Sequence, residues 1–148
     1  MRSGKDPIQA HAEFLAENTD IPNVPNLVLL ILYDLRVPVH CAGFRYLKDV
    51  IPAALCQPSH IVETELFDDV GSRYIPQVSF RNMDTSVRDV VQMAWRERTY
   101  ERWRKYMPEY IMERRKTPTN LEFISCIVYF LEYWQNCCEK EAGHEAIT

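Results

Sequence analysis

The side chains of this chain best suited to contacting another molecule lie in residues 79–98, SFRNMDTSVRDVVQMAWRER. Arginine, asparagine and threonine occur there beside an apolar stripe, and these side chains can bind base edges or phosphates. After a short helix and a turn, such a segment is typical of the second helix of a helix-turn-helix, which lies in the major groove of DNA. Asp84 and Asp89 in the same segment carry a charge that phosphates repel. The segment therefore predicts either a helix that contacts DNA bases or a helix of a DNA-binding fold whose base-contacting surface has been altered.

Charge is unevenly distributed along the chain. The 148 residues have a formal net charge of −4, which argues against a protein that coats nucleic acid. Residues 81–116 nevertheless carry 10 basic and 6 acidic side chains, whereas residues 1–80 carry 6 and 10 and residues 117–148 carry 1 and 5. A basic segment between acidic flanks is compatible with a small phosphate-contacting surface and equally with a solvated face of mixed charge.

Local signals predict the helices that position this segment. Ser79 can cap a helix whose apolar residues recur at steps of three and four. These residues are Phe80, Met83, Val87, Val90, Val91 and Ala94. Ahead of it we expect one helix to about Leu66 and a second through Tyr74, broken near the paired aspartates, and then a turn at 75–78.

The remaining segments also have helical patterns. An amphipathic piece, PIQAHAEFLAEN, precedes a helix that Asn26 can cap, and Pro52 should kink or end the next one. A basic aromatic helix, RTYERWRKYM, follows the central segment, and its aromatic residues are expected in the core rather than on a stacking surface. Thr119 and Glu122 form a capping box for a long last helix, whose apolar face must be covered by the same chain or by a dimer partner. No stretch alternates with period two, so the chain is expected to be all-α.

Several functional classes lack support in the sequence. There is no glycine-rich phosphate loop or serine-elbow motif. His60, Glu63 and Glu65 lie near one another in the sequence, but nothing identifies a nucleophile, a base and an orienting group acting together, so no enzyme is expected. His40, Cys41, Cys56 and His60 do not have zinc-site spacing, so no metal or cofactor is expected. The longest apolar run, LVLLILY, is too short to span a membrane, and five cysteines without CxxC pairs favour a reduced, cytoplasmic location.

Four blocks carry a resemblance to a known family. They are VPVHCAGFRYLKDVI, LFDDVGSRY, VRDVVQMAW and PTNLEFI, in this order. Together they resemble the C-terminal effector domain of the sporulation response regulator, the master transcription factor of endospore-forming Firmicutes, over about residues 26–135. The resemblance implies a six-helix-type bundle of the winged-helix-like effector class that contains a helix-turn-helix. It also implies binding to a short promoter element of double-stranded DNA, with pairs of domains in contact on the DNA.

The resemblance also implies which residues face the DNA. The family's recognition face falls on Arg81, Asn82, Asp84, Thr85, Arg88 and Asp89. Arg88 matches the family, and Asp84 keeps an acceptor where the family has glutamate. Thr85 and Asp89 stand where the family has arginine and histidine, so two donors are lost. Phosphate contacts are expected from Arg96, Arg98 and Arg102, and also from Arg104, Lys105 and the RRK at 114–116.

We therefore expect residues 1–25 to form an arm or linker, residues 26–138 the effector-like domain and residues 139–148 a tail. No receiver domain is expected, because only about 25 residues precede the effector-like region. The first hypothesis is a DNA-binding transcriptional regulator that acts as a homodimer or tandem pair. The alternative is a protein-interaction module of the same fold that has lost its DNA-reading face and binds another regulator.

Overall fold

A computed structural model describes residues 6–18, 20, 23–57 and 61–147 of the chain, with side chains described as far as residue 140. Within these residues there are eight helices and no strand, so the all-α prediction is confirmed and no β-wing is formed by them. Six helices have nine or more residues, and α6 and α7 are single turns. The helices are α1 (Pro7–Asn18), α2 (Val24–Asp34), α3 (Ala42–Leu55), α4 (Glu63–Gly71), α5 (Phe80–Arg96), α6 (Tyr100–Trp103), α7 (Glu109–Glu113) and α8 (Asn120–Ile147).

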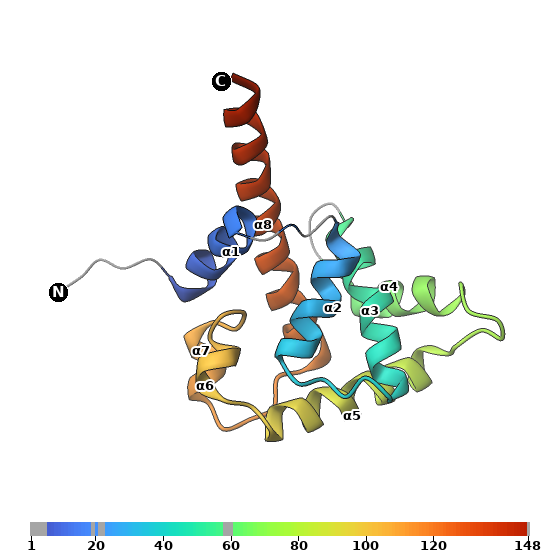
Figure 1. Ribbon diagram of the computed structural model, residues 1–148. Helices are drawn as coiled ribbons and strands as arrows, with labels where there is room; N and C mark the ends of the chain where they lie inside the picture. The colour runs from blue at the N-terminus through green and yellow to red at the C-terminus, as the bar shows by residue number, and fades with distance from the viewer. Residues whose placement is uncertain (1–5, 19, 21–22, 58–60, 148) are drawn as a thin grey trace.

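The bundle is arranged around α3 and α8. Helix α3 contacts α2, α4, α5 and α8, while α1 packs along α8. Figure 1 shows α5 along one edge of the bundle and the C-terminal half of α8 extending beyond it. Helix α1 lies in the segment predicted to be an arm, and its Ile8, Ala12 and Leu15 are buried. The long apolar face of α8 is covered by helices of the same chain, as expected, and its Phe123, Ile127 and Leu131 are fully buried.

Helix α5 forms for the reasons that its sequence predicts. The Ser79 hydroxyl accepts a hydrogen bond from the Asn82 N–H at 3.1 Å and so satisfies one of the free donors of the first turn. The predicted apolar stripe is buried except for Phe80, which is half-buried and packs beside Phe67. The opposite face of α5 is left to solvent.

A close crossing fixes α5 against α3. A Cβ atom added at Gly43 would lie 2.2 Å from the Ser86 carbonyl oxygen and 2.7 Å from a Val90 methyl group. Only glycine therefore allows the two backbones to approach this closely. The capping box at the start of α8 is also confirmed, because the Glu122 N–H donates to the Thr119 hydroxyl and the Thr119 N–H donates to the Glu122 carboxylate.

Several predicted helix boundaries were wrong. Asn23, not Asn26, caps α2: its side chain accepts from the Asn26 N–H at 3.0 Å, and Pro25 fits within the first turn because no donor is needed there. Helix α3 continues three residues past Pro52. Helix α4 is unbroken at Asp68 and Asp69, because both carboxylates face solvent while Leu66, Phe67 and Val70 continue the buried stripe.

The basic aromatic segment does not form one helix. It forms the single turn α6 and then a loop, which brings Trp103 and Tyr106 into the core with no exposed surface. The core prediction is confirmed for these two residues. It is wrong for Tyr100, and Tyr110, which we also expected in the core, is exposed as well.

Candidate nucleic-acid interface

Helices α4 and α5 form a helix-turn-helix whose turn is longer than predicted. Helix α4 ends at Gly71 instead of Tyr74, and the turn runs from 72 to 79. The Val78 N–H donates to the Gly71 carbonyl at 3.0 Å, which closes the turn. A Cβ atom at Gly71 would lie 2.2 Å from the Val78 carbonyl oxygen, so glycine is required at the end of α4.

The exposed face of α5 carries most of the predicted base-reading residues. Arg81, Asn82, Thr85, Arg88 and Asp89 are exposed on it, and Arg96 is exposed at its C-terminal end. In Figure 1 this helix lies at the edge of the bundle, with α3 on its inner side. The structure thus brings donors and acceptors together on one helix face, as the resemblance implies.

Asp84 differs from its neighbours because its side chain has partners inside the protein. One carboxylate oxygen pairs with Arg88 at 2.5 Å, and the other accepts from the Asn120 side chain at 3.0 Å. Its side chain is only 19% exposed. Asp84 therefore holds Arg88 in place and links α5 to the start of α8, instead of offering a free acceptor on the surface.

Glu63, at the start of α4, adds a second carboxyl group to this cluster. Burial raises the pKa of Glu63, and the charge of Asp84 and a hydrogen bond with it raise this pKa further, whereas Arg88 lowers it. One arginine is thus shared by two neighbouring carboxyl groups. Glu63, which was considered as a catalytic residue, belongs to an electrostatic cluster behind the exposed face of α5.

Two of the predicted phosphate-contacting residues also have internal partners. The Arg98 guanidinium lies 3.6 Å from the centroid of the Trp95 ring and donates to the Trp95 carbonyl at 2.7 Å. Arg102 donates to the Asp34 carboxylate at 3.0 Å. Because both guanidinium groups already bind within the protein, among the three predicted phosphate contacts only Arg96 has no internal partner in the described part of the chain.

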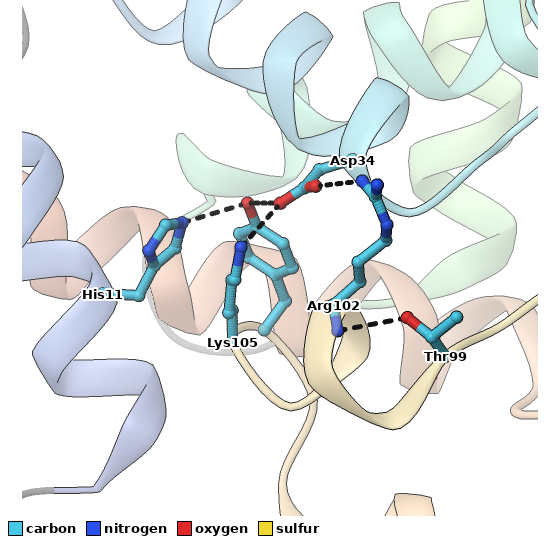
Figure 2. Close-up of polar contacts among 6 residues, drawn as sticks. His11, Asp34, Thr99, Arg102 and Lys105 are labelled. Atoms are coloured by element: carbon cyan, nitrogen blue, oxygen red, sulfur yellow. Dashed lines mark hydrogen bonds and ion pairs between the residues drawn. The ribbon is translucent and has the colours of Figure 1, made fainter.

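Asp34 lies at the centre of a polar network shown in Figure 2. Besides Arg102, it accepts from the Tyr106 hydroxyl at 2.7 Å and pairs with Lys105 at 3.7 Å. The Tyr106 hydroxyl also contacts His11 Nε2 at 3.2 Å, which links α1 to the network. Burial raises the pKa of Tyr106, and the hydrogen bond to Asp34 raises it further, so the phenol stays protonated.

Sequence reasoning missed Asn120 and Asp34, although each had a signal. Asn120 follows the Thr119 cap inside the PTN block, and it is the buried polar residue of the described core. Asp34 is the single charged residue of the apolar helix VPNLVLLILYD. The sequence shows that such residues need partners but not which ones.

The other expected basic residues have mixed roles. Arg114 pairs with Glu122, and Arg104 lies over the Tyr100 ring at 5.3 Å. Arg115 and Lys116 are exposed in the loop before α8. No three His, Cys, Asp or Glu side chains converge as metal ligands within the described ranges, and His60 lies outside them. Among the helices that the structure describes, none is long and apolar enough to cross a membrane.

Comparison with known proteins agrees with this geometry. The family model described as sporulation initiation factor Spo0A C terminal matches residues 28–131, which is most of the chain and includes the whole helix-turn-helix. No solved structure matches the chain. The chain therefore belongs to the family of Spo0A C-terminal domains of sporulation initiation factors.

Proposed function

We propose that this protein is a transcriptional regulator that binds double-stranded DNA by placing α5 in the major groove. The observation that carries the proposal is the exposed polar face of α5, directly after a helix-turn-helix turn, in a chain of the Spo0A C-terminal family. Arginine on such a face can donate two hydrogen bonds to guanine. Arg81 and Arg88 are the two arginines on this face.

The base-reading surface in this proposal comprises Arg81, Asn82, Thr85, Arg88 and Asp89. Asp84 acts from behind this surface, because it holds the Arg88 guanidinium. An exposed aspartate at 89 can accept a hydrogen bond from the cytosine amine, and Thr85 is a short donor and acceptor. Because Thr85 and Asp89 stand where the family has arginine and histidine, we expect them to favour a different promoter element from the one that the arginine and histidine would bind.

Phosphate attraction in this proposal comes from exposed basic residues outside the base-reading surface. Arg96 extends from the C-terminal end of α5, and Arg115 and Lys116 precede α8. Arg98 and Arg102 would reach a phosphate only by giving up Trp95 and Asp34. We propose that they mainly hold the end of α5 and α6 in place. Two copies bound side by side on the DNA would double the number of phosphate contacts. We also propose that the protein acts in the cytoplasm.

The test is selection from random double-stranded DNA at a low and a moderate salt concentration. Enrichment of a sequence whose binding weakens with salt supports the proposal. Arg88→Ala should relax the preference at one or two base pairs, at a cost of about 1–3 kcal/mol. Arg73→Ala is the matched control, since Arg73 forms a similar exposed pair with an aspartate four residues away but lies in the turn. It should leave the sequence preference unchanged.

A second candidate function is a protein-interaction module that regulates by binding another protein. The observation in its favour is that Arg88 and Arg102 are already neutralised by aspartates, while Asp89 is exposed on the same side of α5 as Arg88. Selection that enriches no sequence even at low salt would reject DNA reading. Recovery of a protein partner that is unaffected by nuclease treatment would then support the second function.

A further inference from the structure

A cavity of about 510 Å³ lies where three distant segments meet. It is bordered by the start of α1, the residues around the start of α7 and the first turns of α8. Its size is within the usual range for small-molecule sites. The described residues that line it are Asp6, Ile8, Tyr106, Pro108, Tyr110, Leu121, Glu122, Ser125, Cys126 and Tyr129.

Three tyrosines lie at or behind the wall of the cavity. Tyr110 and Tyr129 are 64% and 50% exposed, so each can contact a molecule that enters the cavity. Tyr106 lies behind this wall: it has no exposed surface, and its hydroxyl is bound by Asp34 and His11. Two aromatic rings, those of Tyr110 and Tyr129, are therefore accessible from the cavity.

The charged groups of the cavity are both acidic. Asp6 and Glu122 are carboxylates, and the described lining includes no lysine, arginine or histidine. The hydrogen bond from Arg114 lowers the pKa of Glu122, with the Thr119 N–H also lowering it, so Glu122 is ionised at neutral pH. Burial raises the pKa of the Cys126 thiol to about 11, so this group stays neutral. Arg114 offsets the charge of Glu122, so Asp6 is the carboxylate of the described lining that has no basic partner among the described residues.

Both carboxylates are held in position. Asp6 accepts from the Ile8 N–H at 2.8 Å, and Glu122 is fixed by the capping box and by Arg114. The electron-rich faces of aromatic rings attract cations, and they do so best when a desolvated cation with an apolar surface is enclosed by several rings. An anion would be repelled by Asp6, and a neutral molecule would gain no charge attraction from it.

We propose that this cavity binds a small organic ammonium ion, with the rings of Tyr110 and Tyr129 against its cationic head and with Asp6 supplying the opposite charge. The methyl or methylene groups of such an ion would contact Ile8, Pro108 and Leu121. No lining residue belongs to α5. The site therefore goes beyond DNA binding, and its test is independent of DNA.

The experiment titrates the full-length protein with tetramethylammonium, choline and benzyltrimethylammonium and follows amide chemical shifts by NMR. The neutral isostere of choline, with carbon in place of nitrogen, is the matched ligand control. We expect at least one ammonium ion to bind with a dissociation constant below about 10 mM and to shift residues of α1, α7 and early α8. The isostere should bind at least about threefold more weakly.

Variants distinguish the contribution of the Tyr129 ring to ammonium binding from a general loss of stability. Tyr129→Leu should weaken ammonium binding at least about threefold, whereas Tyr129→Phe, which keeps the ring, should retain it. Tyr33→Leu is the control, because Tyr33 is similarly exposed at 62% but lies on α2 outside the cavity. The proposal is wrong if none of the three ions binds, if the isostere binds as tightly, or if Tyr129→Leu and Tyr33→Leu have equal effects.

Discussion

The side-chain amide of Asn120 donates to both the main-chain carbonyl and the carboxylate of Asp84, each at 3.0 Å. Asn120 is only 5% exposed, so this contact is made in the interior, between the first turn of α8 and the first half of α5. The same carboxylate holds Arg88. The position of the Arg88 guanidinium on the exposed face of α5 thus depends on a residue 32 positions later in the chain.

Replacing Asn120 by alanine should destabilise the fold. The variant removes two interior hydrogen bonds, one to the Asp84 main-chain carbonyl and one to its half-buried carboxylate, and we expect the free energy of unfolding to fall by about 1–3 kcal/mol. Urea denaturation measures this change. Asn82→Ala is the control, since Asn82 is exposed on the same helix and should alter stability by less than about 0.5 kcal/mol. Equal stabilities for the two variants would contradict a structural role for Asn120.

Gly43→Ala tests the crossing of α3 and α5. Alanine has the better helix propensity by about 1 kcal/mol, but its Cβ would collide with the Ser86 carbonyl. We expect a net loss of about 1–3 kcal/mol, because backbone atoms must move to relieve the collision. Thermal or urea unfolding measures it. A Gly43→Ala protein as stable as the wild type would show that the two helices can separate without cost.

The network around Asp34 predicts a pH dependence of stability. The pKa of His11 is lowered to about 4: burial is the largest cause, the charge of Lys105 adds to it, and Asp34 opposes both. In the unfolded chain the pKa is the ordinary 6.5, so between these two values the unfolded state binds more protons. Stability should therefore fall as the pH decreases from about 6.5 toward 4. Because His11 is partly exposed, the effect will be smaller than full burial would give.

His11→Gln provides the comparison for this pH dependence. Glutamine can still hydrogen-bond the Tyr106 hydroxyl but does not titrate, so the decline in stability between pH 6.5 and 4 should be shallower than in the wild type. Urea midpoints at closely spaced pH values measure the difference between the two proteins. Carboxylates that titrate in this range contribute to both curves and cancel in the comparison. Parallel curves would rule out His11 as the origin of the effect.

Arg96 and Arg102 should have different effects on DNA binding. Arg96→Gln removes an exposed charge at the end of α5, so the slope of log binding constant against log salt should decrease in magnitude by about one, for all duplex sequences. Arg102→Gln should leave that slope unchanged and lower stability instead, because Arg102 pairs with the half-buried Asp34. Filter binding at several salt concentrations, combined with urea unfolding, distinguishes the two. A reduced slope for Arg102→Gln would show that it reaches the phosphates.

Much of the helical architecture was predictable because its signals are local. The Ser79 cap and the capping box of Thr119 and Glu122 join residues three positions apart. The apolar stripe of α5 repeats within one helix and was predicted almost residue by residue. Helix boundaries were predicted wrongly where residues that usually interrupt a helix were tolerated within one. Pro52 was accommodated inside α3, and the paired aspartates of α4 lie on its solvent side.

The sequence by itself determined which helix carries the candidate site and, apart from Asp84, which of its predicted contact residues face outward, because helical periodicity and burial of the apolar stripe fix both. Only the tertiary structure decided which charges on and near that helix remain free. Asp84 is bound by Asn120, 36 positions away, and Arg102 by Asp34, 68 positions away. Pairs so distant in the chain leave no periodic pattern, since their partners are set by how helices pack. The net charge of this surface therefore depends on how the helices pack, whereas the position of the surface follows from the sequence of α5.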